Sequence, residues 1–434
     1  MLFIAIRVCA GQDPVSVPAV EGLVLDENTK SPLPGVRVRA FQIDYDLNGI
    51  SSLSFVPDAE LLTDNDGRYV LKNLPPGQYF IRAERNGFKS IFYPNTTDWR
   101  TAAPLAYTGV DIVGIDLALG SRDLYRVGGT IANGAADPAK GYIVQWIDLV
   151  SVDGFSEESR LEFNQAKDKV GHFEVGDLTS GTYEISAYTR IPDSPGKKGN
   201  AGRTRVDVRS EDVKNVEIVL RPGIDLKGRI AVREDSPPLD LSKLQVWLRA
   251  RYAGFVKRPT NPDSAGVGED GSFTIRDVHE EEHQFMGILD LPDYAYIQEA
   301  TVDGIDALHS WVTIHSDSSY LNIIVDGNGG EVSGHVVSGS ASLYDDSATV
   351  VLVPVRRPGE LDGGSSRTVT IEPGSAFQIQ GVRPGEYRLL AWHKSKGNAY
   401  LNDDFMSAYA AKSTVVKIDR GSHLIANAPV VDAQ

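Results

Sequence analysis

The sequence has almost no cysteine and no excess of basic residues, and each shortage excludes a class of protein. The only cysteine among the 434 residues is Cys9, so neither a disulfide within the chain nor a cysteine-based zinc site can form. The formal net charge of -16 argues against nonspecific binding to nucleic acid and against docking on an anionic membrane, because both need basic surfaces. We interpret this acidity as a source of solubility.

Long apolar runs and catalytic motifs are also missing. No segment after the N-terminus approaches the ~18 consecutive apolar residues of a spanning helix, so no membrane span is expected. There is no Gly-x-Ser-x-Gly elbow, no phosphate-binding Walker loop and no dinucleotide-binding fingerprint. We therefore predict a protein that is not an enzyme and that uses no cofactor.

Residues 1–19 resemble a signal for export. A short apolar run is followed by small residues at Val8 and Ala10, which suit a cleavage site. The basic start of such a signal is missing apart from Arg7, so a truncated start is a second interpretation. The leader predicts a secreted, periplasmic or cell-surface protein.

One sequence motif recurs four times along the chain. It begins with an aromatic residue, alternates apolar and polar residues, passes a turn and ends near a second aromatic, as in Tyr69 to Tyr79. The first aromatic residues are 104, 100 and 104 residues apart: Tyr69, Phe173, Phe273 and Phe377. A repeat at that interval indicates one domain copied four times.

Each copy reads as a set of short strands. Apolar residues alternate with polar ones around the turn, as in Tyr79, Ile81 and Ala83, and a period of two is typical of a half-buried strand. Five to seven such strands per ~100 residues predict an all-β protein of four tandem Ig-like or prealbumin-like β-sandwich domains. The predicted domains cover 20–120, 121–223, 224–330 and 331–434. The best helical candidate is Asp403 to Ala411. Trp146, Trp247 and Trp392 are expected in the core, although Trp146 and Trp247 are out of phase with some apolar neighbours, which also allows them to be exposed.

The first copy resembles carboxypeptidase regulatory-like domains. The resemblance rests on three segments of this copy: Ser31-Pro-Leu-Pro-Gly-Val, Thr63-Asp-Asn-Asp-Gly-Arg-Tyr and Leu74-Pro-Pro-Gly-Gln-Tyr. These domains are small prealbumin-like sandwiches that are grouped under the carbohydrate-binding-like fold. With its several copies, the chain is similar to exported proteins of soil bacteria such as Acidobacteria. The resemblance implies a non-catalytic accessory, adhesive or binding module. It does not carry a ligand with it, because function depends on sites rather than folds.

Aromatic residues after the first hairpin are the best candidates for a ligand site. Tyr93, Trp99 and Tyr107 stand among polar residues, and an exposed flat ring beside polar groups can stack on a sugar. The sequence equally allows these rings to cover one end of the sandwich. Carbohydrate binding here is therefore an alternative function.

A zinc-protease pattern, H-E-x-x-H, occurs at His279 and His283. That chemistry needs both histidines on one face of a helix. Here the string stands where other copies have their turn, and strand-like residues flank it, so we interpret it as a charged hairpin loop. A zinc-dependent hydrolase remains a remote alternative.

The string Asp64-Asn65-Asp66-Gly67 resembles part of a calcium-binding loop, but the later ligands are missing and Asp-Gly also suits a hairpin turn.

We predict a binding or spacing protein whose partner is a polysaccharide or a protein of the cell envelope. The sequence leaves its oligomeric state open.

Overall fold

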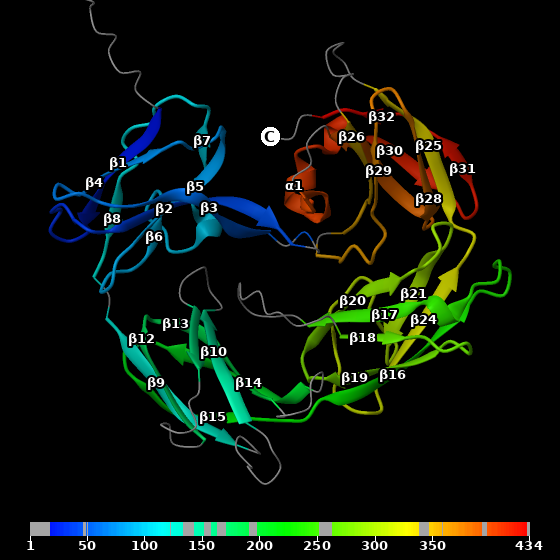
Figure 1. Cartoon of the computed structure of the whole chain (residues 1–434), viewed down its shortest axis with the longest axis horizontal. Helices are drawn as coiled ribbons and strands as arrows, with labels where there is room; N and C mark the ends of the chain where they lie inside the picture. Colours follow the sequence, from blue (N-terminus) through cyan, green and yellow to red (C-terminus); the bar gives the residue numbers. More distant parts are fainter. Residues whose placement is uncertain are drawn as a thin grey trace, which may run out of the picture. The chain divides into compact units, whose positions relative to one another are not determined.

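The structure is a computed structural model that describes residues 18–46, 49, 51–121, 123–132, 143–151, 158–162, 171–190, 198–250, 263–337, 347–357, 359–392 and 397–431. Residues 1–17 of the signal-like leader, which include Cys9, lie outside these residues. The described residues form two compact units, one built from 18–43 and 53–124 and the other from the remainder. Nearly all regular structure is β-strand (Figure 1).

Two sheets make the sandwich around residues 19–119. One has the strand order β4-β1-β8, and the other has the order β3-β2-β5-β6 with β7 paired to β5. Side chains from both sheets form one core, which includes Tyr69 and Tyr79. A 3₁₀ turn, Trp99–Thr101, lies between β6 and β7. The strands are β1 (Ala19–Asp26), β2 (Arg37–Tyr45), β3 (Ser51–Leu62), β4 (Arg68–Lys72), β5 (Gly77–Glu84), β6 (Ile91–Phe92), β7 (Leu105–Tyr107) and β8 (Leu117–Leu119).

The next sandwich lies around residues 125–219. Its sheets have the orders β12-β9-β15 and β11-β10-β13-β14, with Phe173 and Tyr183 in the shared core. The side chain of Trp146 lies outside the described residues. The strands are β9 (Tyr125–Ala132), β10 (Ile143–Ser151), β11 (Glu158–Glu162), β12 (His172–Leu178), β13 (Gly181–Arg190), β14 (Lys198–Val208) and β15 (Val213–Val219).

A third sandwich occupies residues 224–326. Its sheets have the orders β19-β16-β24-β21-β22 and β18-β17-β20-β23. Phe273 and Phe285 lie in its core, whereas Trp247 is half-buried. A 3₁₀ turn spans Leu241–Lys243. The strands are β16 (Ile224–Val232), β17 (Gln245–Ala250), β18 (Asp263–Gly266), β19 (Ser272–Val278), β20 (Glu282–Leu289), β21 (Tyr296–Val302), β22 (Ile305–Asp306), β23 (Val312–Thr313) and β24 (Tyr320–Asp326).

The last sandwich has the sheets β28-β25-β31, with β32 paired to β25, and β27-β26-β29-β30. The helix predicted at 403–411 is confirmed in part as α1 (Asp403–Ser407), flanked by 3₁₀ turns Ala399–Leu401 and Ala410–Lys412. Trp392 packs against this insertion and is buried. The strands are β25 (Gly330–Val337), β26 (Ala348–Pro354), β27 (Arg367–Ile371), β28 (Ala376–Val382), β29 (Gly385–Trp392), β30 (Thr414–Ile418), β31 (His423–Ile425) and β32 (Ala428–Pro429).

The same strand pairing recurs in every sandwich. Strands β1, β9, β16 and β25 each pair antiparallel with one strand and parallel with at least one other. Each also carries a glycine where the parallel neighbour approaches. A Cβ on Gly129 would lie 1.8 Å from the Val216 carbonyl oxygen, and one on Gly334 would lie 1.9 Å from that of Ala426. The all-β sandwich prediction is confirmed, while the domain boundaries at 120, 223 and 330 stay predictions.

A tyrosine closes the repeated turn in three sandwiches. The hydroxyl of Tyr79 donates to the Pro75 carbonyl at 2.6 Å, and Tyr387 donates to Arg383 at 2.7 Å. Tyr183 donates in the same way to Thr179 at 3.0 Å. The third sandwich has Phe285 at this position, which has no hydroxyl to donate. Its turn is therefore not held by this bond, and it is the longer turn that contains His279.

Candidate functional site

The predicted sugar platform does not present its largest ring to solvent. Trp99 is 4% exposed and packs edge-on against Phe80, with ring centroids 5.9 Å apart. The guanidinium of Arg100 lies over the Trp99 ring, 5.4 Å from its centroid. Tyr107 is 3% exposed, and Tyr93 is half-buried against the core. In this conformation neither Trp99 nor Tyr107 offers a ring face for stacking. Carbohydrate binding at these residues stays an untested alternative.

The H-E-x-x-H string lies on a hairpin, as the sequence predicts. Residues 279–281 turn between β19 and β20. His279 Nε2 faces the Gly199 carbonyl oxygen at 3.0 Å. His283 lies on β20 and is fully buried, so its interpretation as part of a solvated loop is wrong. Its Nδ1 is 2.8 Å from the Glu281 carbonyl oxygen, and its Nε2 is 3.8 Å from Asp263 Oδ2. The two imidazoles do not share a helical face.

Within the described ranges, no group of three or more histidine, cysteine, aspartate or glutamate residues could hold a metal ion. The string Asp64–Gly67 forms a tight turn. The Asp64 carboxylate accepts from the backbone N–H groups of Asp66 and Arg68, at 3.0 and 2.8 Å. Zinc binding at His279 and His283 stays the remote alternative that the sequence left open.

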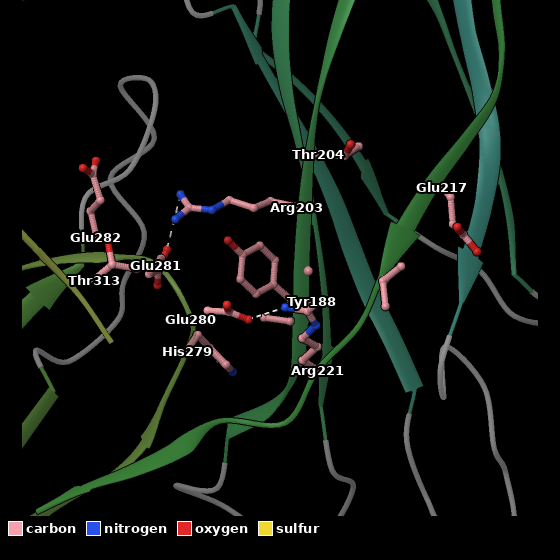
Figure 2. A pocket seen from close by; sticks show the side chains of 13 residues that line it. Tyr188, Arg203, Thr204, Glu217, Arg221, His279, Glu280, Glu281, Glu282 and Thr313 are labelled. Atoms are coloured by element: carbon pink, nitrogen blue, oxygen red, sulfur yellow. Dashed lines mark hydrogen bonds and ion pairs between the residues drawn. The ribbon is translucent and has the colours of Figure 1, made fainter. Parts of the chain in front are cut away.

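A polar pocket lies where the 279–282 turn meets the second sandwich. Its volume is about 450 Å³, and strands β13, β14 and β15 form one side of it. Figure 2 shows the Tyr188 ring between two ion pairs that reach across the pocket, Arg203 with Glu281 and Arg221 with Glu280. We call the contacts around linker residues 221–223 the Arg221 joint.

The ion pairs of the Arg221 joint differ in closeness. Arg221 donates a hydrogen bond to Glu280. The Arg203 guanidinium is 3.8 Å from Glu281 and 3.7 Å from Glu184, and it makes no hydrogen bond to the described residues. The sequence shows the H-E-x-x-H string but not its partners, because these come from β14 and from the linker of the preceding repeat.

A second set of contacts surrounds linker residues 326–330, which we call the Asp326 joint. The Asp326 carboxylate is fully buried at the end of β24. It accepts hydrogen bonds from Arg420 Nε at 2.6 Å, from the Tyr296 hydroxyl at 3.0 Å and from the Asn328 backbone at 2.9 Å. Arg420, which comes from the last sandwich, also donates to both oxygens of Asp235 at 2.8 and 2.9 Å.

Backbone groups and an imidazole extend the Asp326 joint. The Gly329 N–H donates to the Tyr294 carbonyl at 3.1 Å, and the Leu361 N–H donates to the His309 carbonyl at 2.9 Å. The His309 ring lies between Asp306 and Arg383, with 2.8 Å on each side. The third and fourth sandwiches thus share backbone and side-chain hydrogen bonds.

The charges of the Asp326 joint shift one another's pKa values. Burial opposes ionisation of Asp326, but the hydrogen bonds from Arg420, Asn328 and Tyr296 together outweigh it and lower the pKa of the carboxyl. Burial and the bond to Asp326 raise the pKa of Tyr296 to about 12. The hydrogen bond to Asp326 raises the pKa of Arg420. The sequence patterns predict a domain boundary at 330 but none of these contacts.

Comparisons with known proteins concern the first sandwich and the fold. Residues 19–105 match the family model of the carboxypeptidase regulatory-like domain. A search of curated protein sequences found no match. Among solved structures, a streptococcal ancillary pilin is 13% identical, with 71% of this chain and 99% of that chain covered and a TM-score of 0.24.

Two other structures show similarity of the same kind. A minor pilin of Streptococcus agalactiae is 15% identical over 47% of this chain and 97% of its own, with a TM-score of 0.23. The Bacillus anthracis TIE protein is 10% identical over 98% of this chain and 76% of its own, with a TM-score of 0.20. TM-scores this low carry no inference about the chain. The family match confirms the resemblance read from the first copy: residues 19–105 are similar to a carboxypeptidase regulatory-like domain.

Proposed function

We propose that this chain is a non-catalytic extracytoplasmic protein in which β-sandwiches act as a spacer with a fixed joint. The Asp326 joint is the observation that carries the proposal. One guanidinium, Arg420, holds two carboxylates of the preceding sandwich with four hydrogen bonds. Bidentate arginine–carboxylate contacts fix direction as well as distance, so such a contact resists rotation of one sandwich against the next.

The packing around the linker supports the same conclusion. A Cβ on Gly329 would lie 2.5 Å from the Cα of Gly381, and a Cβ on Gly381 would lie 2.2 Å from the Asp293 carbonyl oxygen. Backbone approaches this close leave no space for the linker to pivot. Glycine-rich linkers are usually flexible, but these glycines serve contact between two backbones.

The non-catalytic and extracytoplasmic parts of the proposal rest on other grounds. The carboxypeptidase regulatory-like domain is an accessory module, and the leader at residues 1–19 suggests export. No helix among the described residues is long and apolar enough to cross a membrane. A cell-envelope protein or a polysaccharide would be the partner that such a spacer presents or contacts.

Calorimetry of the full chain tests the proposal. Arg420→Ala removes the clamp, and Arg357→Ala is the matched control, because the Arg357 side chain is 89% exposed and, among the described residues, its ion pair is with Glu360. If the joint couples the sandwiches, their shared unfolding transition splits or broadens in Arg420→Ala and keeps its shape in Arg357→Ala. An unchanged transition in Arg420→Ala would contradict a fixed joint. Turnover of peptides or glycans that a point mutation abolishes would contradict the non-catalytic part.

A further inference from the structure

Three polar side chains gather on the outer face of the last sandwich, on the sheet β28-β25-β31. Glu331 and Ser333 are two residues apart on β25, and Val332 between them is fully buried, so both side chains point outward. The parallel register places His423 of β31 beside Glu331. A hydroxyl, an imidazole and a carboxylate therefore share one solvent-facing surface.

The distances within this group suit a nucleophile, its base and an orienting acid. Ser333 Oγ lies 3.0 Å from His423 Nε2. On the other side of the ring, His423 Nδ1 lies 3.3 Å from Glu331 Oε1. A serine within hydrogen-bond reach of a base that a third group orients is the arrangement that activates serine hydroxyls.

Glu331 is itself held in place and kept ionised. Its carboxylate accepts hydrogen bonds from Gln378 Nε2 at 2.9 Å and from Gln380 Nε2 at 3.1 Å, both on β28. The bond from Gln378 does most to lower the pKa of Glu331, and burial opposes it. An ionised carboxylate favours a proton on the imidazole nitrogen that faces it, so Nε2 of His423 keeps its lone pair for the hydroxyl proton of Ser333.

We propose that Ser333 is an acylation site, at which the chain takes a short acyl group from an activated ester. The Ser333 oxygen attacks the carbonyl carbon of the ester while its proton passes to His423 Nε2. The bond from that carbon to the leaving oxygen then breaks, and the leaving group takes the proton from His423, which gives an acyl-serine and a free alcohol. The inference goes beyond the spacer function and uses neither joint, since one transfer onto the chain is a modification and not turnover.

Ile425 should favour longer acyl groups at this site. It lies beside Ser333 in the register of β25 and β31, and it shares the face of His423, two residues before it. Its side chain is 78% exposed, the highest value among the exposed large hydrophobic residues of the described ranges. An ester at Ser333 can cover this apolar surface with its alkyl chain, so a butyryl group should transfer faster than an acetyl group.

Peptide mapping by mass spectrometry tests the proposal on the full chain. The probes are p-nitrophenyl acetate and p-nitrophenyl butyrate, and the measured quantity is the rate at which Ser333 gains the acyl group. Ser272 is the internal comparison, because it is exposed and its hydroxyl donates to the Asp270 carboxylate at 2.7 Å. His423→Gln removes the base. His335→Gln is the matched control, since His335 is exposed two residues after Ser333 on the same face of β25.

The largest expected difference concerns the nucleophile and its base. Ser333 should be acylated roughly a hundredfold faster than Ser272. That rate should fall about a hundredfold in His423→Gln and stay unchanged in His335→Gln. Melting temperatures show that each variant is folded. The proposal is overturned if Ser333 reacts no faster than Ser272, or if the two histidine variants react at the same rate.

Two further variants test the roles of Glu331 and Ile425. In Glu331→Gln the rate should fall about tenfold, and the pH at which it reaches half its maximum should move down, because the imidazolium loses its neighbouring anion. An unmoved pH profile would contradict this positioning role. Ile425→Ala should lower the ratio of butyryl to acetyl transfer roughly threefold, and an unchanged ratio would contradict the preference for longer acyl groups.

Release of nitrophenol separates this inference from the spacer proposal. Release that stops after one equivalent per chain agrees with a modification of Ser333. Continued release that requires Ser333 would support the nucleophile but contradict the non-catalytic part of the proposed function. Release without acylation of Ser333 in the wild type would contradict the acylation site and leave the spacer function untouched.

Discussion

The Asp326 joint and the Arg221 joint each connect two consecutive sandwiches, but their contacts differ. At the first, a buried carboxylate receives hydrogen bonds of 2.6–3.0 Å from three residues, and the backbones of the two sandwiches touch. At the second, Arg203 faces Glu281 at 3.8 Å across a pocket of about 450 Å³. The first joint is filled and the second is hollow. Repeated domains can therefore carry different tasks at their junctions while their cores stay alike.

The repeated turn explains part of this difference. In the second and fourth sandwiches the hydroxyls of Tyr183 and Tyr387 hold the turn to its own strand. In the third, Phe285 cannot make that bond, and the longer turn carries Glu280 and Glu281 toward the second sandwich. The sandwich that has phenylalanine in place of this tyrosine is thus the one whose turn lines the pocket.

The largest effect is expected from Asp326→Ala, which leaves Arg420 and Tyr296 without their buried partner. Breaking a buried ion pair by removing one side costs about 3–5 kcal/mol. Hydrogen exchange of amides in β24 and β25 measures the change, because exchange reports the local free energy of opening. A loss below about 1 kcal/mol would place this joint among ordinary surface ion pairs.

Gly381→Ala should destabilise the filled joint by roughly 2–4 kcal/mol, from left-handed backbone strain together with overpacking. Gly381 has φ of 62°, and its Cβ would meet the Asp293 carbonyl oxygen at 2.2 Å. Gly374 is the control, since its φ is 73° and a Cβ there would have no neighbour within 4 Å. Chemical unfolding of both variants measures the difference. Equal losses would show that backbone strain alone acts at Gly381 and that the close contact does not matter.

Acid should weaken the Asp326 joint more than the Arg221 joint. The pKa of Asp326 is lowered in the folded protein, so its contribution to stability is present above the ordinary aspartate pKa and is lost as the pH falls through the folded value. Hydrogen exchange of β24 amides between about pH 5 and pH 2 measures this loss. In Arg420→Ala the pH dependence should shrink, because the main hydrogen bond that lowers the pKa is gone. A pH dependence identical to that of the wild type would contradict this assignment.

The smallest effect is expected at the hollow joint. Glu280→Gln removes the charge that faces Arg221, whose side chain is 63% exposed. Solvent screens such a pair, so stability should change by less than about 1 kcal/mol. Chemical unfolding beside Asp326→Ala makes the comparison direct. A loss of stability as large as that of Asp326→Ala would mean that the ion pairs of the two joints contribute equally to stability.

Much of the fold could be predicted from the sequence because local patterns specify it. The aromatic residues at 69, 173, 273 and 377 are all buried, and the repeated glycine marks the close approach of a parallel strand. Alternation with a period of two is local information and survives in every copy.

The joints could not be predicted because their partners are far apart in the chain. Arg420 and Asp235 are 185 residues apart, and His279 and Gly199 are 80 residues apart. No spacing rule connects such pairs. The candidate sugar site at Trp99 could not be judged from the sequence for a different reason. An aromatic residue among polar neighbours gives the same sequence pattern whether its ring is exposed or covered, as Trp99 is by Arg100.

The most direct test of a filled and a hollow joint is a distance distribution between paired spin labels. In a chain with Cys9→Ser, one pair of labels at residues 227 and 417 spans the Asp326 joint, and a second pair at 214 and 227 spans the Arg221 joint. All of these positions carry exposed lysines. We predict one narrow distance distribution for the first pair, which broadens in Arg420→Ala, and a broader distribution for the second. Equally broad distributions, or a first pair that ignores Arg420→Ala, would contradict this prediction.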